Sequence, residues 1–281
     1  MIYKLIAQTK ATKREEFYYK NILPSKTIEE AREDVEKWAS QYSREIEVLQ
    51  QNEQYRKEFL QNLSHELKTP IFSIQGYIDT IISGAIDNRE LCMKFLQNTS
   101  KNVDRLVNLT DDLDQITKLE IGELKLQTTS FVIQELTKEV FEVFSLRSEE
   151  KRIHCSIKKD SEIPVMVIAD KEKIRQVLIN IIDNALKYGK VNGKIEAAFY
   201  KLENHTALIE ISDDGEGISE EHRQRIFERF YRIDQARSRT IGGSGLGLAI
   251  CKHIIEAHQQ NIHVRSTPDV GSTFCFSLPL K

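Results

Sequence analysis

The sequence has no apolar run of the roughly 18 residues that a membrane-spanning helix needs. Its opening segment, MIYKLIAQTK, is neither long nor apolar enough to be a signal peptide. These two absences predict a soluble chain without a membrane span. We expect it in the cytoplasm, on its own or as the cytoplasmic part of a larger membrane-anchored protein.

Cysteine is also scarce. The four residues are Cys92, Cys155, Cys251 and Cys275, with no CxxC pair and no spacing typical of metal ligands. This pattern argues against a disulfide framework or a zinc site. It predicts reduced thiols, buried or half-buried, in a cytosolic protein.

Neither sign of charge predominates, since 40 basic residues stand against 43 acidic ones. No run of Lys and Arg is long enough to form a local basic patch, so we expect no nucleic-acid partner. The length of 281 residues gives room for about two domains, each able to bury a core.

The first half of the chain has a helical pattern. After a mixed segment at residues 1–27, no Gly or Pro occurs between Thr27 and Pro70. Apolar residues keep one heptad phase, which Glu53 and Arg56 interrupt; they are Val35, Ala39, Tyr42, Ile46, Leu49, Leu60 and Leu63. This pattern fits a long helix that pairs with a second copy of itself, and also a single solvated helix.

A second helical pattern follows a turn at Ser83-Gly84 and runs from about residue 90 to 120. One stripe of this helix carries Leu96, Val103, Leu106 and Leu113. Two long helices joined by a short loop make an antiparallel hairpin. Its apolar stripes would be buried best in a dimeric four-helix bundle.

After Gly122 the pattern changes to an α/β type. Short β-type runs cover residues 125–131, 153–157, 165–168, 194–202, 207–212, 262–266 and 273–278, and helical patterns cover 133–149, 171–188 and 245–258. The alternation predicts a mixed sheet with helices packed on one face. The fold class is therefore α + α/β: a helical hairpin followed by an α/β sandwich domain.

The motif SHELKTP places His65 on the first long helix, with its apolar neighbours facing elsewhere. Glu66 is adjacent, and Thr69 lies one turn on, on the same face as His65. Pro70 cannot pair with the carbonyl of Glu66, so we expect a bend there. An exposed imidazole beside a carboxylate suits phosphoryl transfer, although a histidine on a helix is often a plain surface residue.

The motif NIIDNALKY lies on the helix predicted at 171–188, with Asp170 as its N-cap. Its spacing puts Asn180, Asn184, Lys187 and Tyr188 on one side of a helix that is otherwise apolar. Buried amides need partners, which a hydrated Mg²⁺ and triphosphate oxygens would supply. The alternative is a structural helix whose amides face solvent.

Three further motifs follow. DDGEGI places Asp213 at the end of a strand, where it can accept a hydrogen bond from an amine. Gly215 and Gly217 let the backbone approach a flat ligand closely, or they form a plain turn.

GGSGLGL opens a helix, whose free N–H groups suit phosphate, and it lacks the Lys-Ser/Thr of a Walker A loop. FERFYR and the polar stretch 234–240 suggest a lid, in which Arg229 reaches a phosphate or faces solvent.

In combination, these motifs resemble the five sequence boxes of the sensor histidine kinases of two-component signalling, over roughly residues 55–281. SHELKTP resembles the phospho-acceptor box and NIIDNALKY the asparagine box. DDGEGI and GGSGLGL resemble the two glycine boxes, and FERFYR the phenylalanine box. The resemblance implies a helical-hairpin homodimer followed by a Bergerat-type ATP-binding domain.

The resemblance also implies a role for each motif. His65 would be the phospho-acceptor, Glu66 the adjacent base, and Thr69 would place a water for dephosphorylating the partner protein. Asn184, helped by Asn180, would bind Mg²⁺. The ATP-binding set would comprise Asn180, Asn184, Lys187, Tyr188, Asp213, Gly215, Gly217, Arg229, Gly243, Gly245, Leu246 and Gly247.

On this basis we divide the chain into four parts: an uncharacterised segment (1–27), a signalling or coiled-coil helix (28–58), a dimerisation and phosphotransfer hairpin (59–122) and a catalytic ATP-binding domain (123–281). The expected function is an ATP-dependent autokinase that phosphorylates His65 and passes the phosphoryl group to an Asp of a response regulator. The same site would also suit a phosphatase of that regulator. A regulator-binding scaffold and a stand-alone ATPase are the alternatives; the complete ATP site argues against the first and SHELKTP against the second.

Overall fold

The computed structural model describes residues 28–120, 126–161, 163–203, 205–233 and 244–281. The chain divides into two compact units, Met1–Leu60 and Gln61–Lys281. The predictions made for residues 1–27, for the polar stretch 234–240 and for Gly243 lie outside the described residues. Within the described ranges, no helix combines the length and the apolar character needed to cross a membrane.

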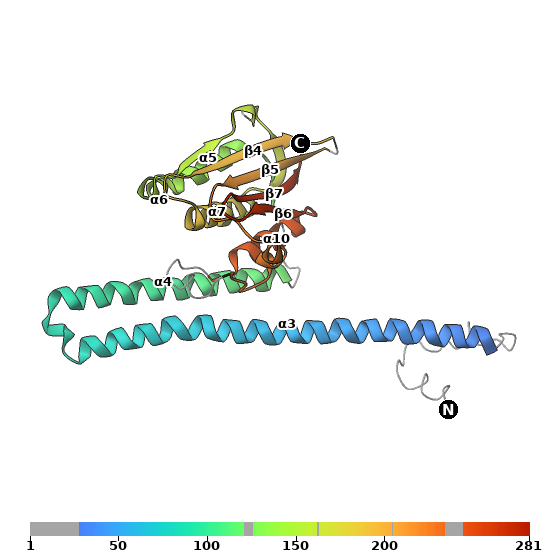
Figure 1. Cartoon of the computed structure of the whole chain (residues 1–281), viewed down its shortest axis with the longest axis horizontal. Coiled ribbons are helices and arrows are strands. Elements are labelled where there is room, and N and C mark those ends of the chain that lie inside the picture. Colours follow the sequence, from blue (N-terminus) through green and yellow to red (C-terminus); the bar gives the residue numbers. More distant parts are fainter. Residues whose placement is uncertain (1–27, 121–125, 162, 204, 234–243) are drawn as a thin grey trace. The chain divides into compact units, whose positions relative to one another are not determined.

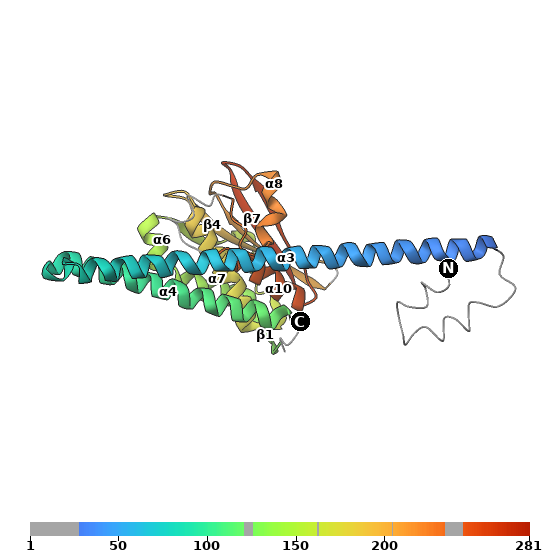
Figure 2. The ribbon, with the colours of Figure 1, turned by 90° about the horizontal axis from the view of Figure 1, so that it is seen from below.

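The two predicted long helices are present. Helix α3 spans Ile28–Ile82 and continues through Pro70 as one assigned helix. A 3-10 turn, η1 (Ala85–Asp87), leads into α4 (Arg89–Glu120), where the side chain of Asn88 accepts a hydrogen bond from the backbone N–H of Leu91 at 3.1 Å. Figures 1 and 2 show α4 antiparallel to the second half of α3, which confirms the predicted hairpin.

The hairpin buries only part of its apolar surface within one chain. Tyr77 of α3 stacks on Phe95 of α4, with ring centroids 5.6 Å apart. On the predicted stripe of α4, however, Leu96 and Val103 remain 49% and 45% exposed. The heptad positions earlier in α3 are also open to solvent, as Tyr42 shows with 41% exposure. These stripes are available to a second copy of the chain.

The α/β region contains a five-stranded mixed sheet. Its strands are, in spatial order, β2 (His154–Ile157), β4 (Lys194–Lys201), β5 (Thr206–Asp213), β7 (Gly271–Pro279) and β6 (Ile262–Thr267). Strands β2 and β4 are parallel, and the other neighbours are antiparallel. A separate ribbon pairs β1 (Thr128–Val132) with β3 (Met166–Asp170), and a bridge between Val167 and Leu280 connects that ribbon to the end of the chain.

One face of the sheet carries the core. Along β5, Ala207, Ile209 and Ile211 are buried, and the residues between them are only half-buried. Helix α7 (Lys171–Tyr188) packs against β4 and β5, and α10 (Gly247–Ala257) packs against β6. Burial alternates from one residue to the next along β5, and the helices contact the sheet as described. Both observations confirm the predicted mixed sheet with helices on one face.

One predicted helix is in fact two. The pattern at 133–149 forms α5 (Ile133–Val143) and α6 (Ser145–Lys151), separated by Phe144 with a ψ of 6°. The ring of Phe144 is buried, with 8% exposure, so the backbone turns where this side chain enters the core. The short elements α8 (Glu220–Arg223), η2 (Lys159–Ser161) and η3 (Arg225–Phe227) have no counterpart among the predicted elements.

Candidate functional site

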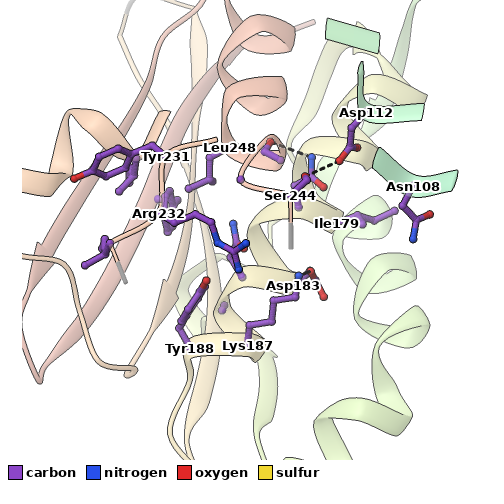
Figure 3. Close-up of a pocket in the computed structure, with 18 of the residues that line it drawn as sticks. Asn108, Asp112, Ile179, Asp183, Lys187, Tyr188, Tyr231, Arg232, Ser244 and Leu248 are labelled. Atoms are coloured by element: carbon purple, nitrogen blue, oxygen red, sulfur yellow. Dashed lines mark hydrogen bonds and ion pairs between the residues drawn. The ribbon is translucent and has the colours of Figure 1, made fainter. Parts of the chain in front are cut away.

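A cavity of about 1100 Å³ collects most of the predicted site residues, as Figure 3 shows in part. Its lining includes Glu66, Asn180, Asn184, Lys187, Tyr188, Asp213, Gly217, Gly245 and Gly247. His65, Thr69, Gly215, Arg229 and Leu246 are not among the lining residues. The cavity therefore unites the asparagine motif, the Asp213 motif and the described part of the glycine-rich loop.

Helix α7 positions the polar face of the cavity. It begins at Asp170, whose side chain accepts a hydrogen bond from the backbone N–H of Lys173 at 3.2 Å, as predicted for an N-cap. The helix is anchored by seven buried apolar side chains, which leaves only one side for polar residues. On that side, Asn180 Nδ2 donates to the backbone oxygen of Gly247 at 3.1 Å, so one of the amides also fixes the start of α10.

Lys187 does not stand alone in the cavity. Its Nζ lies 2.6 Å from Asp183 Oδ2, and Arg147 Nη1 lies 2.6 Å from Asp183 Oδ1. The side chains of Lys187 and Asp183 are about one-fifth exposed, which makes this pair less screened than a surface ion pair. Asp183 is not among the predicted site residues, although its position four residues before Lys187 is the spacing of a helical ion pair.

Asp213 lies at the end of β5, where its Oδ1 accepts the backbone N–H of Gly215 at 2.9 Å. Burial raises the pKa of this carboxyl, against the effect of hydrogen bonds from the backbone of Gly215 and Ser272. Only Oδ1 is engaged by Gly215, so the carboxyl retains acceptor capacity toward an amine in the cavity.

Two glycines permit close backbone contacts around the cavity. Gly217 has a φ of +71°, and a Cβ there would overlap the backbone oxygen of Thr267. Gly245 has a φ of +73°, and a Cβ there would lie 2.9 Å from the backbone of Phe230. Both glycines thus let two chain segments meet closely at the edge of the cavity.

The described part of the glycine-rich loop is held at several points. The backbone N–H of Phe230 donates to Gly245 O at 2.9 Å. Ser244 Oγ donates to Asp112 Oδ2 at 2.8 Å and accepts from the backbone N–H of Leu246 at 3.2 Å. The side chain of Leu246 is fully buried, which explains why this predicted ATP-binding residue does not line the cavity.

The phospho-acceptor motif presents His65 to solvent, as predicted. Thr69 Oγ1 donates to the backbone oxygen of His65 at 3.1 Å. The adjacent Glu66 forms ion pairs with Arg105 of α4 at 2.8 Å and with Arg232 at 3.6 Å. Arg105 could not be predicted as a site residue, because nothing in its local sequence indicates that a carboxylate 39 positions earlier is its partner.

The aromatic and arginine motif FERFYR contributes different residues from the one predicted. Arg229 does not line the cavity, and burial lowers its pKa. Tyr231 does line it; its hydroxyl lies 2.7 Å from His222 Nδ1 and its ring lies under the guanidinium of Arg225, 4.3 Å from the centroid. Arg232, the partner of Glu66, lines the cavity as well.

The cavity offers donors for a nucleotide and oxygen ligands for a hard cation. Among the residues that the structure describes, no group of three or more His, Cys, Asp or Glu could hold a metal by itself. The amide oxygens of Asn180 and Asn184 are of the type that Mg²⁺ accepts, but two amides do not complete its octahedral shell. The residues therefore fit a Mg²⁺ ion that arrives with phosphate oxygens and water.

Comparison with known proteins gives two family matches. Residues 169–281 match the "Histidine kinase-, DNA gyrase B-, and HSP90-like ATPase" family model. Residues 55–122 match the "His Kinase A (phospho-acceptor) domain" model. Together the two models cover more than half of the chain: the first spans the α/β region from the end of β3 onward, and the second spans the hairpin from within α3 to just after α4.

Individual proteins agree with these matches. The sensor histidine kinase WalK of Bacillus subtilis (strain 168) is 34% identical over 230 residues, which are 82% of this chain and 37% of WalK. The Acinetobacter baumannii histidine kinase AdeS superposes with a TM-score of 0.63 and 27% identity, over 77% of this chain and 98% of AdeS. Full-length ShkA in complex with AMPPNP superposes with a TM-score of 0.60 and 26% identity, over 79% of this chain and 46% of ShkA.

This chain thus spans less than two-fifths of the length of that WalK protein. The two family models occur in the order hairpin, then ATPase region, and the cavity joins the residues of three separate motifs. The chain belongs to the sensor histidine kinase family of two-component systems.

Proposed function

We propose that this chain binds ATP in the cavity beside α7 and transfers the γ-phosphoryl group to His65, from which it passes to an Asp of a response regulator. The observation that carries the proposal is the presence, in one chain, of an exposed histidine in SHELKTP and a cavity that unites Asn184, Lys187 and Asp213. AMPPNP, which ShkA binds, is an ATP analogue, and this supports the choice of nucleotide.

We assign the site residues by their chemistry. Asp213 would accept a hydrogen bond from the adenine amine, beside Tyr188, which lines the same cavity and is 40% exposed. Lys187 would meet the phosphates with the described part of the glycine-rich loop. Mg²⁺, held by Asn184 and Asn180 together with phosphate oxygens, would neutralise charge on the transferring group.

Glu66 would hold the second ring N–H of His65 and so favour attack by the other nitrogen. In the structure the Glu66 carboxylate forms ion pairs with Arg105 of the same hairpin and with Arg232. Thr69, one turn on, would place a water for removal of the phosphoryl group from the regulator. Transfer itself depends on bringing the γ-phosphate in line with His65.

We further propose that the chain acts as a homodimer through its hairpin and that its partner is a response-regulator receiver domain. The exposed stripe with Leu96 and Val103 supports the first part. The cytoplasmic location and the four-part division of the chain stay predictions from the sequence.

The test is incubation of the purified chain with γ-labelled ATP and Mg²⁺ beside His65→Ala. We expect an acid-labile, alkali-stable label on the wild-type chain and at least a hundredfold loss of label in the variant, because no other group is assigned as acceptor. ATP binding should be equal in both. Full-strength labelling of His65→Ala would overturn the acceptor assignment, and intact ATP binding without label would favour a phosphatase or scaffold.

A further inference from the structure

The carboxylate of Asp183 is shared between two cations. Oδ1 faces Arg147 Nη1 and Oδ2 faces Lys187 Nζ, each at 2.6 Å. Asp183 and Lys187 both line the cavity, and Figure 3 shows them side by side on α7. Arg147 is not among the lining residues, and its ion pair with Asp183 connects it to a residue that is.

Arg147 is held in place by helix α6. Its guanidinium lies 5.6 Å from the ring centroid of Phe144, a buried residue at the start of that helix. On the same helix, Lys151 Nζ donates to the backbone oxygens of Leu186 and Lys187, at 2.6 and 3.1 Å. Helix α6 therefore fixes both the end of α7 and the position of the Arg147 charge.

We propose that Arg147 is a positioning residue for the phosphates of ATP and acts through Asp183 on Lys187. This inference rests on the proposed function, since it assumes that Lys187 meets the phosphates. When Lys187 turns toward a phosphate, the phosphate competes with Asp183 for the N–H donors of its ammonium group. Asp183 is only 23% exposed, so its carboxylate would be energetically unfavourable there without a cationic partner. Arg147 remains as that partner while Lys187 contacts the phosphate.

The charge balance leads to the same conclusion. Arg147, Asp183 and Lys187 together carry one net positive charge, which favours a polyanion. Without Arg147, the remaining pair carries no net charge, and Asp183 competes with phosphate for Lys187. Without both Arg147 and Asp183, the single positive charge of Lys187 is restored and has no competitor.

The experiment measures binding of AMPPNP with MgCl₂ to the full chain by calorimetry, at low salt and in 0.5 M NaCl. Arg147→Gln should weaken binding by about two- to fivefold at low salt, as for a partly exposed ion pair. The difference should shrink at high salt because the charges are screened. Asp183→Asn in the Arg147→Gln background should return the affinity to the wild-type range.

Arg175→Gln is the matched control, because Arg175 also lies on α7 and forms ion pairs, with Glu139 at 2.6 Å and Glu172 at 3.4 Å, but does not line the cavity. It should leave AMPPNP binding unchanged. Asp183→Asn alone should bind at least as well as wild type; a loss there would make Asp183 itself a ligand of the metal or nucleotide and overturn the proposal.

Two other results would also overturn the proposal. The first is that Arg147→Gln binds AMPPNP with wild-type affinity. The second is that Asp183→Asn does not restore binding in the Arg147→Gln background, which would indicate a structural role for Arg147. Thermal melts of each variant separate binding from folding. Failure of the wild-type chain itself to bind AMPPNP would overturn the proposed function, and this result differs from every result that concerns Arg147 alone.

Discussion

At the scale of single residues, the site depends on groups whose ionisation is set by their surroundings. Asp213 is an example, because burial raises the pKa of its carboxyl above the ordinary value of an aspartate. The adenine amine is a donor, and an ionised carboxylate accepts from it more strongly than a protonated one does. As the pH is lowered, Asp213 should therefore become protonated at a higher pH than an exposed aspartate would. Nucleotide binding should weaken at that higher pH.

We expect AMPPNP affinity to fall as the pH is lowered through the raised pKa of Asp213 and to be constant above it. The change should be roughly tenfold, the difference between a charged and a neutral hydrogen-bond acceptor. Fluorescence or calorimetric titration from neutral pH downward, within the range where circular dichroism shows a folded chain, checks this. Asp213→Asn should bind weakly at every pH and lack this acid limb; an acid limb of the same shape in the variant would assign it to another group.

At the scale of secondary-structure elements, a buried histidine connects two parts of the α/β region. His258, at the end of α10, accepts the backbone N–H of Asp170 at Nε2 (3.0 Å), and its Nδ1 pairs with Ile254 O (2.8 Å). It is 8% exposed. The two contacts fix one neutral tautomer, with the proton on Nδ1, because a carbonyl only accepts and an N–H only donates.

His258→Ala should destabilise the α/β region by about 1–3 kcal/mol, because it leaves the buried N–H of Asp170 without an acceptor. Thermal or urea unfolding followed by circular dichroism measures this change. The matched control is His263→Ala, since His263 is an exposed residue of β6, and it should change stability by less than about 0.5 kcal/mol. Equal stability of His258→Ala and wild type would contradict the bridging role.

The elements themselves were largely predictable, and their boundaries depended on contacts that the sequence does not display. The 171–188 pattern became α7 because a capping Asp170 and a continuous apolar face indicate the same helix. The break at Phe144 was missed because its pattern is helical and only the core decides where its ring goes. Helix α10 begins at Gly247, two residues later than predicted, because Gly245 has a positive φ.

The site was predictable where its residues belong to one motif. Asn180, Asn184 and Lys187 lie on one helix, so a spacing of three and four residues brings them together. The pairs of Asp183 with Arg147 and of Glu66 with Arg105 join segments 36 and 39 residues apart. Such pairs depend on tertiary packing, and no local pattern indicates them.

At the scale of the whole molecule, the exposed stripe of α4 predicts self-association. Leu96→Glu should weaken dimerisation at least tenfold, because it places a charge where an apolar side chain would be buried in both copies. Analytical ultracentrifugation over a concentration series measures this. Gln97→Glu, an exposed neighbour with the same change of charge, should behave as wild type. A monomeric wild-type chain, or an equally dimeric Leu96→Glu chain, would contradict the proposed interface.

Asp170, at the end of β3, connects the first turn of α7 with the chain segment that precedes β1. The same Asp170 carboxylate that caps α7 through Oδ1 also accepts the backbone N–H of Gln127 through Oδ2, at 2.9 Å. Gln127 is among the first described residues after α4. Both contacts use the same carboxylate. A shift of the chain at Gln127 should therefore affect the stability of the first turn of α7. The position of the helix that carries Asn184 and Lys187 therefore depends in part on the chain segment that precedes β1.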